Sequence, residues 1–356
     1  MTRREFIGKA GLASAGAFAG CAAPNLFARG DGRMWAVLLH LGTNMWSDVR
    51  VEDRVTKGFY KWGGKDGWAL YSDTLRFDEK VFHEAAERMA AKGVNTLVLD
   101  LGEGLLYPSH PELAIEGTWS PKKMREELKY LRGLGLEVVP KLNFSSCHDP
   151  WLKQYERMLS TKRYYTVCSD VIRDTVDVFD GPKCLHLGYD EEDYWHQHTY
   201  NYIVVRQGEG WWKDFSFFVE TTEKAGVRPW IWSDYVWRHE EEFLKRMPRS
   251  VLQSNWYYGT LDEKKFPKEK SEFDFCRKML HANEPLERGG FDQVPTAMPN
   301  VNFFDFFEYS RKVIAPERFK GFMNSVWCFT QPHKRDFIFK AIDQVGEARR
   351  RFEARV

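Results

Sequence analysis

The chain has 356 residues, enough for one large domain or two ordinary ones. Its formal net charge of +1 gives no indication of a nucleic-acid or anionic-membrane partner, and neither is expected. Part of its 14 tryptophans must fill a core, and an excess beyond that need suits a protein that stacks flat apolar faces such as sugar rings.

The N-terminus is predicted to be a twin-arginine export signal covering residues 1–30. A pair of arginines opens it, and the weakly apolar stretch 10–23 is too short and too rich in Ala and Gly to span a membrane. Cys21 ends a loose lipobox, which predicts a lipid anchor, whereas residues 17–19 predict ordinary cleavage instead. We therefore expect an exported protein, periplasmic or anchored as a lipoprotein facing the periplasm or cell surface, with residues 31–356 as its mature part.

Eight apolar, β-branched or aromatic runs follow, each short enough to be a buried strand. In chain order these runs are 34–42, 95–101, 136–144, 183–188, 228–233, 250–256, 293–298 and 321–327.

Amphipathic helical patterns separate most of the predicted strands. The clearest covers 78–92, repeats apolar residues three and four apart, and ends at Gly93. A second opens at Ser120 and Pro121, with proline at the first helical position. The remaining predicted helices are 164–179, 211–224, 240–247, 303–313 and 334–352.

This alternation predicts an α/β fold, a single (β/α)8 TIM barrel over residues 31–356. An open doubly wound sheet is the alternative, but the chain lacks a Gly-rich phosphate loop. The connections that follow strands are long, at roughly 43–77, 102–119, 193–210 and 259–290. In a barrel these loops all lie at the C-terminal face, where active sites are built.

The segment from Cys184 to Asp193 carries the strongest functional signal, because an apolar strand runs directly into four acids. Acids avoid burial unless they are paired or working, so this junction places carboxylates partly dry at the rim of the sheet. Such a setting pushes two carboxyl pKa values apart, as acid–base chemistry requires. The structural alternative is a helix N-terminus decorated with acids. We expect Asp190 and Glu191 to be catalytic, and Glu192 and Asp193 to be solvated.

The other strand ends supply a predicted substrate pocket. Carboxylates ringed by tryptophans favour a sugar ring, since aromatic faces stack on pyranose C–H faces and polar groups bind hydroxyls. The expected substrate is therefore an oligosaccharide or glycoconjugate. The candidate substrate-binding residues are Asn143, His148, His186, Trp232, Asp234, Asn255, Trp256, Tyr257 and Trp327.

The seventh predicted strand ends at 295–300 without an acid, although many barrel glycosidases carry their nucleophile there. Substrate-assisted enzymes need no protein nucleophile, because the 2-acetamido oxygen of the substrate attacks the anomeric carbon. One acid then protonates the leaving oxygen, and a second orients the acetamido nitrogen. Two adjacent acids at one strand end suffice for both roles.

The motif His186-Leu187-Gly188-Tyr189-Asp190-Glu191 resembles the His-x-Gly-Gly-Asp-Glu of glycoside hydrolase family 20, the β-N-acetylhexosaminidases. The segments 139–148, 230–234, 255–257 and 324–327 are also similar to that barrel, whereas Tyr189 stands where the family has a second glycine. The resemblance implies a retaining, substrate-assisted hydrolase of a 2-acetamido sugar. It makes Glu191 the acid/base and Asp190 the acetamido-orienting residue.

Two alternatives stay open. A glycosidase acting on a non-acetamido sugar would pair Glu191 with Asp234, Glu103 or Asp100. Carboxyl separation would identify it, at about 5–5.5 Å for a retaining pair and about 6.5–9.5 Å for an inverting pair. A non-catalytic glycan-binding barrel lipoprotein would have its pocket blocked by Tyr189 or by the 193–210 loop.

Neither a metal nor another cofactor is expected. His148, His186 and Asp190 are candidate ligands, but no histidine pair with ligand spacing stands at a strand end. His196 and His198 form an H-x-H in a predicted loop. The mature region has five cysteines without C-x-x-C spacing, which favours buried free thiols with at most one or two disulfides.

Overall fold

The computed structural model of this chain describes residues 32–50, 67–198 and 200–354. The predicted export signal and Cys21 lie outside the described residues, so the division of the chain at residue 30 stays a prediction.

Eight parallel strands form one sheet in the order β6-β5-β4-β3-β2-β1-β8-β7. Isolated parallel bridges from Gln253 to Gln293 and from Trp256 to Thr296 join its two outer strands, so the barrel is nearly closed. The predicted (β/α)8 barrel is confirmed. The strands are β1 (Met34–His40), β2 (Thr96–Asp100), β3 (Glu137–Lys141), β4 (Cys184–His186), β5 (Arg228–Trp232), β6 (Leu252–Ser254), β7 (Thr296–Ala297) and β8 (Gly321–Ser325).

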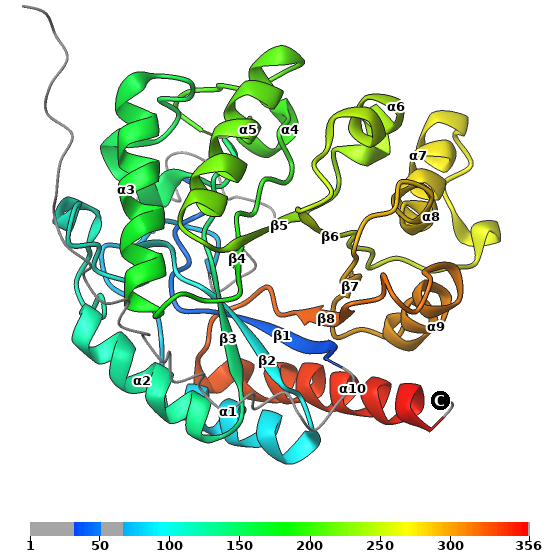
Figure 1. Ribbon diagram of the computed structural model, residues 1–356, viewed down its shortest axis with the longest axis horizontal. Coiled ribbons are helices and arrows are strands. Elements are labelled where there is room, and N and C mark those ends of the chain that lie inside the picture. The colour runs from blue at the N-terminus through cyan, green and yellow to red at the C-terminus, as the bar shows by residue number, and fades with distance from the viewer. Residues whose placement is uncertain (1–31, 51–66, 199, 355–356) are drawn as a thin grey trace, which may run out of the picture. The chain divides into compact units, whose positions relative to one another are not determined.

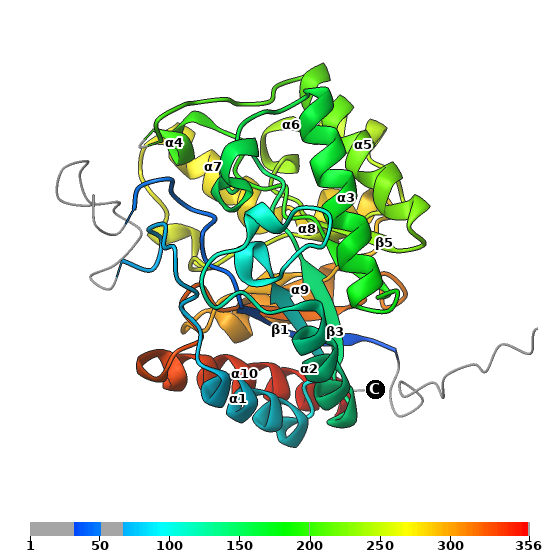
Figure 2. The same cartoon turned by 90° about the vertical axis from the view of Figure 1, so that its left-hand side faces the viewer.

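Helices surround the strands on the outside (Figure 1). In both views α1 and α10 lie side by side, and α10 also packs against β1 and β8 (Figures 1 and 2). The helices are α1 (Glu79–Lys92), α2 (Pro121–Gly133), α3 (Lys162–Val178), α4 (Tyr194–Gln197), α5 (Glu209–Lys224), α6 (Val236–Arg246), α7 (Lys270–His281), α8 (Asn283–Arg288), α9 (Phe303–Val313) and α10 (Arg335–Glu353).

The boundaries of α1 and α2 follow from their capping residues. The Asp78 side chain accepts a hydrogen bond from the Val81 amide, and Gly93 ends α1 in the left-handed conformation at φ 79°. Ser120 accepts from the amide of Lys123 at the start of α2, where Pro121 needs no hydrogen-bond acceptor. Both helices begin within a residue of their predicted positions, and α1 also ends where predicted.

The prediction of a long loop over 259–290 is wrong, because α7 and α8 both lie within it. Along α7 the apolar residues Phe273, Cys276 and Leu280 recur three and four residues apart, so the sequence does carry a helical pattern inside this predicted loop. The short α4 likewise lies inside the predicted 193–210 loop.

Strand alternation divides the apolar core into two layers. One layer fills the barrel and includes Ala36, Leu38, Val98, Val139 and Trp230. The other layer lies between the sheet and the helices, and it contains the intervening residues of the same strands. The strands are therefore buried on both faces, which explains their nearly continuous apolar runs.

The barrel also contains one polar row near the C-terminal ends of its strands. Register pairs His40 with Asp100, Asp100 with Lys141, and Lys141 with His186. The Lys141 Nζ donates to Asp100 Oδ2 at 2.7 Å, and both side chains are buried. Asn143 Nδ2 donates to the other Asp100 oxygen at 2.8 Å. A buried charge pair completed by further hydrogen bonds thus forms the floor beneath the strand ends.

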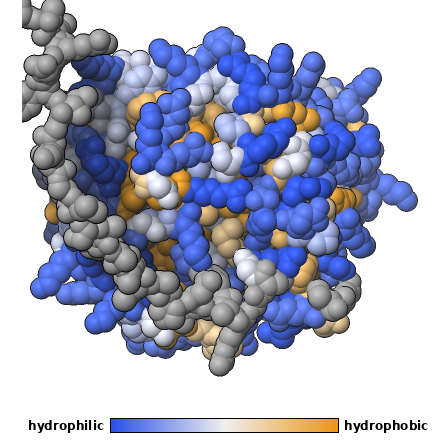
Figure 3. All heavy atoms as spheres, in the orientation of Figure 1, coloured by the Kyte–Doolittle hydropathy of each residue, from blue (hydrophilic) through white to orange (hydrophobic). Residues whose placement is uncertain are grey.

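The cysteines and the surface of the described chain can also be compared with expectation. Cys147, Cys168, Cys184, Cys276 and Cys328 are free thiols. Within the described part of the chain, no helix combines the length and apolar character needed to cross a bilayer. On the face drawn in Figure 3, hydrophilic side chains predominate and apolar ones show between them in several places.

Gly321 provides a stability test of the β1–β8 contact. A Cβ at this position would lie 1.9 Å from the Met34 carbonyl oxygen, and neither backbone can move without breaking the ladder. Gly321→Ala should therefore destabilise the fold by about 1–3 kcal/mol, as overpacking does. Gly133→Ala is the matched control, since a Cβ there meets nothing within 4 Å. Urea unfolding of both variants makes the comparison, and equal stabilities would contradict this account.

Candidate active site

A cavity of about 1130 Å³ lies at the C-terminal ends of the strands. Its lining includes residues at the ends of β3 and β5, and others within a few residues after β3, β4, β6, β7 and β8. The lining residues from these strand ends are Lys141, Asn143, Asp190, Glu191, Trp232, Asp234, Trp256, Tyr258, Met298 and Trp327. The site therefore occupies the end of the barrel that the loop lengths predicted.

Tryptophan rings form much of the cavity wall. Trp327 lies between Trp46 and Trp232, with ring centroids 5.8 and 5.9 Å apart. The indole nitrogens of Trp232 and Trp256 are buried and make no hydrogen bond within the described structure. These donors are available to a ligand with acceptor oxygens, such as a sugar.

The acidic segment after β4 is held in an uncommon backbone conformation. Gly188, Tyr189 and Glu191 all have positive φ, at 70°, 72° and 56°. The left-handed conformation costs an L-residue about 1–2 kcal/mol, so it persists only where surrounding contacts fix it. Here the Glu191 amide donates to Asp234 Oδ2 at 2.9 Å, and the Ser145 hydroxyl donates to the Asp190 carbonyl.

Two histidines hold the side chain of Glu191. His148 Nε2 lies 3.1 Å from Glu191 Oε2 and 3.4 Å from Asp190 Oδ2. His196 Nε2, from α4, lies 3.2 Å from Glu191 Oε1. Asp190 and Glu191 each place one oxygen within 4.8 Å of the other and of His148. The two carboxylates therefore form one compact group with the imidazole of His148.

The contacts determine where protons reside. Burial alone would raise the pKa of Glu191, but hydrogen bonds and charge from His148 and His196 outweigh it and hold that pKa below its ordinary range. Burial alone would lower the pKa of His196, but its bonds to Asp193 and Glu191 raise it to about 10. The pKa of His148 is likewise raised despite burial, by the charge of Asp190 and by hydrogen bonds. In the free cavity the protons therefore reside on the imidazoles.

Asp234 is a third carboxyl group of the cavity, with different properties. Burial raises its pKa well above the usual range, and the negative charge of Asp190 raises it further. Its Oδ1 atom and the Oδ1 atom of Asp190 are buried and make no hydrogen bond within the described structure. Asp234 thus binds the backbone of Glu191 with one oxygen and leaves the other available.

Eight of the residues predicted for the site line this cavity: Asn143, His148, Asp190, Glu191, Trp232, Asp234, Trp256 and Trp327. Three predicted residues, His186, Asn255 and Tyr257, do not line it. His186 is fully buried in the barrel, packed against the rings of Trp230 and Trp232, and its Nδ1 accepts from the Gly188 amide.

The other two residues point away from the cavity because of strand alternation beyond β6. The oxygen of the Asn255 side chain accepts from Trp237 Nε1, and its amide donates to the Met279 carbonyl. The ring of Tyr257 packs against Phe306 of the helix layer. Neighbouring residues point to opposite sides of a strand, so the tyrosine that lines the cavity is Tyr258.

Glu192 also differs from its prediction as a solvated charge. Its side chain is buried in an ion pair with Arg206, and it accepts hydrogen bonds from the amide and hydroxyl of Ser146. Arg206 in turn pairs with the buried Asp214 of α5. The sequence did not predict that Arg206 pairs with Glu192, because Arg206 lies 14 residues beyond it in an irregular segment.

Tyr189 does not block the cavity. Its ring is buried in the helix layer, where it packs edge-on against Trp211, Phe215 and Phe218 of α5. The Arg206 guanidinium covers its face at 4.5 Å. A non-catalytic glycan-binding barrel was expected to have its pocket blocked by Tyr189, and the ring does not do so.

Two of the alternative carboxylates are occupied elsewhere. Asp100 is paired with Lys141 beneath the cavity. Glu103 is buried and accepts hydrogen bonds from the backbone amides of Thr43 and Asn44, so it supports the loop after β1. Neither lines the cavity, which leaves Asp234 as the remaining partner for Glu191 in that hypothesis.

His148, Asp190 and Glu191 also have the geometry to share a cation. Each offers one ligand atom, and the imidazole and carboxylate ligands together suit a metal such as zinc. In the free cavity these atoms bond to one another instead. Of the candidate ligands that the sequence offered, His148 and Asp190 belong to this set, whereas Glu191 takes the place expected for His186.

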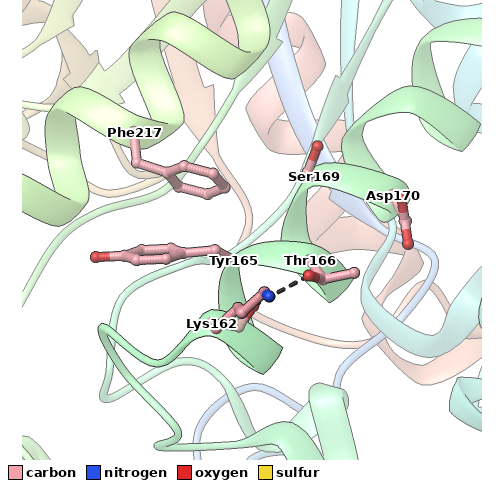
Figure 4. Close-up of a pocket in the computed structure, with 6 residues that line it drawn as sticks. All are labelled: Lys162, Tyr165, Thr166, Ser169, Asp170 and Phe217. Carbon is pink, nitrogen blue, oxygen red and sulfur yellow. Dashed lines mark hydrogen bonds between the residues drawn. The ribbon is translucent and has the colours of Figure 1, made fainter.

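A second, more open depression of about 470 Å³ lies between α3 and α5 on the outside of the barrel. Figure 4 shows its lining residues, with the rings of Tyr165 and Phe217 facing one another. Its one carboxylate, Asp170, is already bonded to His110 and Arg173. The depression holds no pair of acids, so the chemistry concentrates in the larger cavity.

Comparison with known proteins links this fold to sugar hydrolases. No protein-family model and no curated protein matches the sequence. Solved structures do match, among them the family 20 exo-β-N-acetylglucosaminidase from Vibrio harveyi with bound N-acetylglucosamine. That match has 13% identity and a TM-score of 0.56, and it covers 89% of this chain and 54% of the other.

Two further structures agree. The family 20 β-N-acetylhexosaminidase from Streptomyces coelicolor A3(2) matches at 14% identity and TM-score 0.55, over 88% of this chain and 64% of the other. Dispersin B matches at 14% identity and TM-score 0.51, over 76% and 94%. This chain spans about half to two thirds of the length of the first two proteins. At such low identity the likeness shows a shared barrel fold, and the distant resemblance to family 20 holds at that level.

The protonation of Asp234 can be tested through stability. The pKa of Asp234 is higher in the folded chain than in the unfolded chain. Between these two pKa values the folded chain keeps the proton and the unfolded chain has lost it, so the stability of the fold falls as the pH rises. Asp234→Asn removes this loss and should therefore gain stability relative to the wild type between pH 4.5 and 7.5. Urea unfolding at both pH values measures the difference. The exposed Asp274→Asn on α7 should show no such trend, and a flat result for Asp234→Asn would refute the assignment.

Proposed function

We propose that this chain is a glycoside hydrolase that acts on a 2-acetamido sugar, with retention of configuration and assistance from the substrate. Glu191 is the acid/base and Asp190 orients the acetamido group. The observation that carries the proposal is the pair of adjacent carboxylates in a tryptophan-lined cavity, with one oxygen of each less than 4.8 Å from the other.

The short separation argues against an inverting mechanism for this pair. An inverting enzyme keeps its two carboxyl groups about 6.5–9.5 Å apart, because a water molecule must fit between the base and the sugar. Asp190 and Glu191 leave no such space. Their cavity also receives Met298, and no acid, from the end of β7. The attacking atom is then best supplied by the substrate itself.

Asp190 suits the orienting role. Its Oδ1 atom is buried and free of hydrogen bonds within the described structure, so it can accept the N–H of an acetamido group. Its Oδ2 atom stays next to His148. The negative charge stabilises the positive charge that develops on the acetamido group as its oxygen attacks the anomeric carbon.

Glu191 needs a proton before it can act as an acid. In the free cavity His148 and His196 hold that proton and Glu191 is ionised. A sugar that fills the cavity expels water, which disfavours both charges of a carboxylate–imidazolium pair. The proton then moves from an imidazole to Glu191, and from Glu191 to the leaving oxygen. After the leaving group departs, the ionised Glu191 takes a proton from a water molecule. That water attacks the anomeric carbon and opens the cyclic intermediate that the acetamido oxygen formed there.

We also propose that the chain is exported through its N-terminal arginine pair, and is either lipidated at Cys21 or cleaved near residue 19. Support comes from the sequence alone, since a charged start followed by a short apolar stretch is typical of export signals. An exported enzyme would meet extracellular glycans, which are rich in 2-acetamido sugars.

A second candidate function draws support from Asp234. Its raised pKa makes it a protonated acid in the same cavity, so Asp234 and Glu191 are an acid and a carboxylate without any need for an acetamido group. That arrangement would hydrolyse a sugar with an ordinary 2-hydroxyl. The substrate therefore decides between the two functions.

A panel of 4-nitrophenyl glycosides separates them. We expect kcat/KM for the 2-acetamido-β-glucoside to exceed that for the matching 2-hydroxy glucoside by about 10²-fold or more, because the attacking group is absent from the latter. Proton NMR of the first product should show the β-anomer. Equal rates on both glycosides, or an α-anomer, would favour the Asp234 mechanism.

Substitution of the two acids tests their roles. Glu191→Gln should lower kcat by about 10²–10⁴-fold on a 4-nitrophenyl substrate, and by less on a 2,4-dinitrophenyl one, because the better leaving group needs little protonation. Asp190→Asn should lower kcat about 10²-fold on both substrates, since it misplaces the attacking group. Glu240→Gln, on the surface and paired with Arg288, is the control and should match the wild type. Wild-type rates for Glu191→Gln would exclude Glu191 as the acid.

A further inference from the structure

We propose that α4 forms a binding subsite for the second sugar ring of a chain, the ring on the leaving-group side of the cleaved bond. Trp195 and Tyr194 supply its aromatic surface. This inference rests on the proposed function, since it names which part of the substrate lies beyond Glu191.

Exposed aromatic surface gathers in one place on this molecule. Seven large apolar side chains of the described chain are strongly exposed, and five of them fall between residues 194 and 204. Trp195 is 73% exposed and Tyr194 is 54% exposed. Monomeric proteins seldom leave contiguous apolar surface in water without a binding role.

The exposed rings are continuous with the catalytic cavity. Tyr194 and Trp195 line the same cavity as Glu191, whereas Tyr202, Ile203 and Val204 do not. Only part of the exposed surface therefore faces a bound substrate. This continuity identifies the occupant as an extension of the molecule in the cavity, not as a separate partner.

The position of α4 is fixed relative to the proton donor. Asp193 caps the helix by accepting from the His196 amide, and its carboxylate also bonds to the His196 ring. His196 then contacts Glu191 directly. Trp195 belongs to the same short helix as His196, and both side chains line the cavity together with Glu191, so α4 presents the indole ring to that cavity. The glycosidic oxygen must lie at Glu191 to receive its proton, and the ring attached to that oxygen extends toward the same side.

The chemistry of this surface matches a pyranose. An indole face stacks on the C–H face of a sugar, and the adjacent polar groups bind its hydroxyls. Asp193 and Gln207 line the cavity beside Trp195 and provide such groups. The preferred substrate is therefore a β-linked oligosaccharide, in contrast to a single sugar with a small leaving group.

The test compares two substrates that differ only beyond the cleaved bond. The β-1,4-linked disaccharide of N-acetylglucosamine has a second ring, whereas N-acetyl-β-glucosaminyl fluoride has a leaving group too small to reach Trp195. Trp195→Ala should lower kcat/KM about tenfold on the disaccharide and leave hydrolysis of the fluoride within about twofold of the wild type. Tyr202→Ala is the matched control, because Tyr202 is 72% exposed on the same segment but lies outside the cavity.

Several outcomes would overturn the subsite. Equal losses on both substrates would show that Trp195 supports the fold or the catalytic centre. An unchanged rate on the disaccharide, or an equal loss with Tyr202→Ala, would show that the ring does not contact the sugar.

Failure of the proposed function is distinguishable from failure of the subsite. If the wild type hydrolyses neither substrate, the proposed function fails, and the subsite is then tested by calorimetric titration with the β-1,4-linked trisaccharide. Weaker binding by Trp195→Ala, but not by Tyr202→Ala, would support the subsite without turnover. Equal binding by the wild type and both variants, or no binding by any of them, would refute it.

Discussion

The hydrogen bond from the Glu191 amide to Asp234 is the contact on which the cavity depends. It holds Glu191 in a left-handed conformation that costs about 1–2 kcal/mol and that nothing in the side chain itself favours. With the backbone turned in this way, Asp190 and Glu191 reach His148 together. The same contact holds a third carboxyl buried and close to two others, and burial together with the charge of Asp190 raises the pKa of Asp234. Backbone strain and charge repulsion thus share one cause, the packing of three acids at two neighbouring strand ends.

Charge neutralisation around these acids involves groups at different depths. Lys141 neutralises Asp100 inside the barrel, His148 and His196 neutralise Glu191 at the cavity surface, and Arg206 neutralises Glu192 on the helix side. Each of these acids thus has a cationic partner of its own. A buried charge without a partner would cost several kcal/mol. The Oδ1 atoms of Asp190 and Asp234 are buried and make no hydrogen bond within the described residues. A substrate with an amide and several hydroxyls can satisfy both.

The sequence predicted what depends on local pattern and missed what depends on long-range geometry. Apolar runs and caps such as Asp78 and Gly93 located the barrel, and the junction after β4 located the acids. The side to which a residue points was misjudged beyond β6, where Tyr258 and not Tyr257 faces the cavity, because a strand that ends in a bridge gives no pattern from which to count alternation. Arg206 and His196 were not assigned roles, since each meets its acid only through an irregular loop. α7 was missed although Phe273, Cys276 and Leu280 recur at helical spacing along it.

Tyr189, the clearest departure from the family 20 motif, strengthens the site instead of obstructing it. A glycine would adopt its positive φ without strain, yet burial of the tyrosine ring contributes about 1.5–3 kcal/mol, which offsets a strain of about 1–2 kcal/mol. The ring fixes α5 through Trp211 and binds Arg206 on its face. Arg206 in turn draws Glu192 inward, and the segment that connects them contains α4 with His196 and Trp195. In this chain the bulk at position 189 therefore anchors the loop that closes one side of the cavity, so a larger residue in the motif is consistent with a working site whose leaving-group side is built differently.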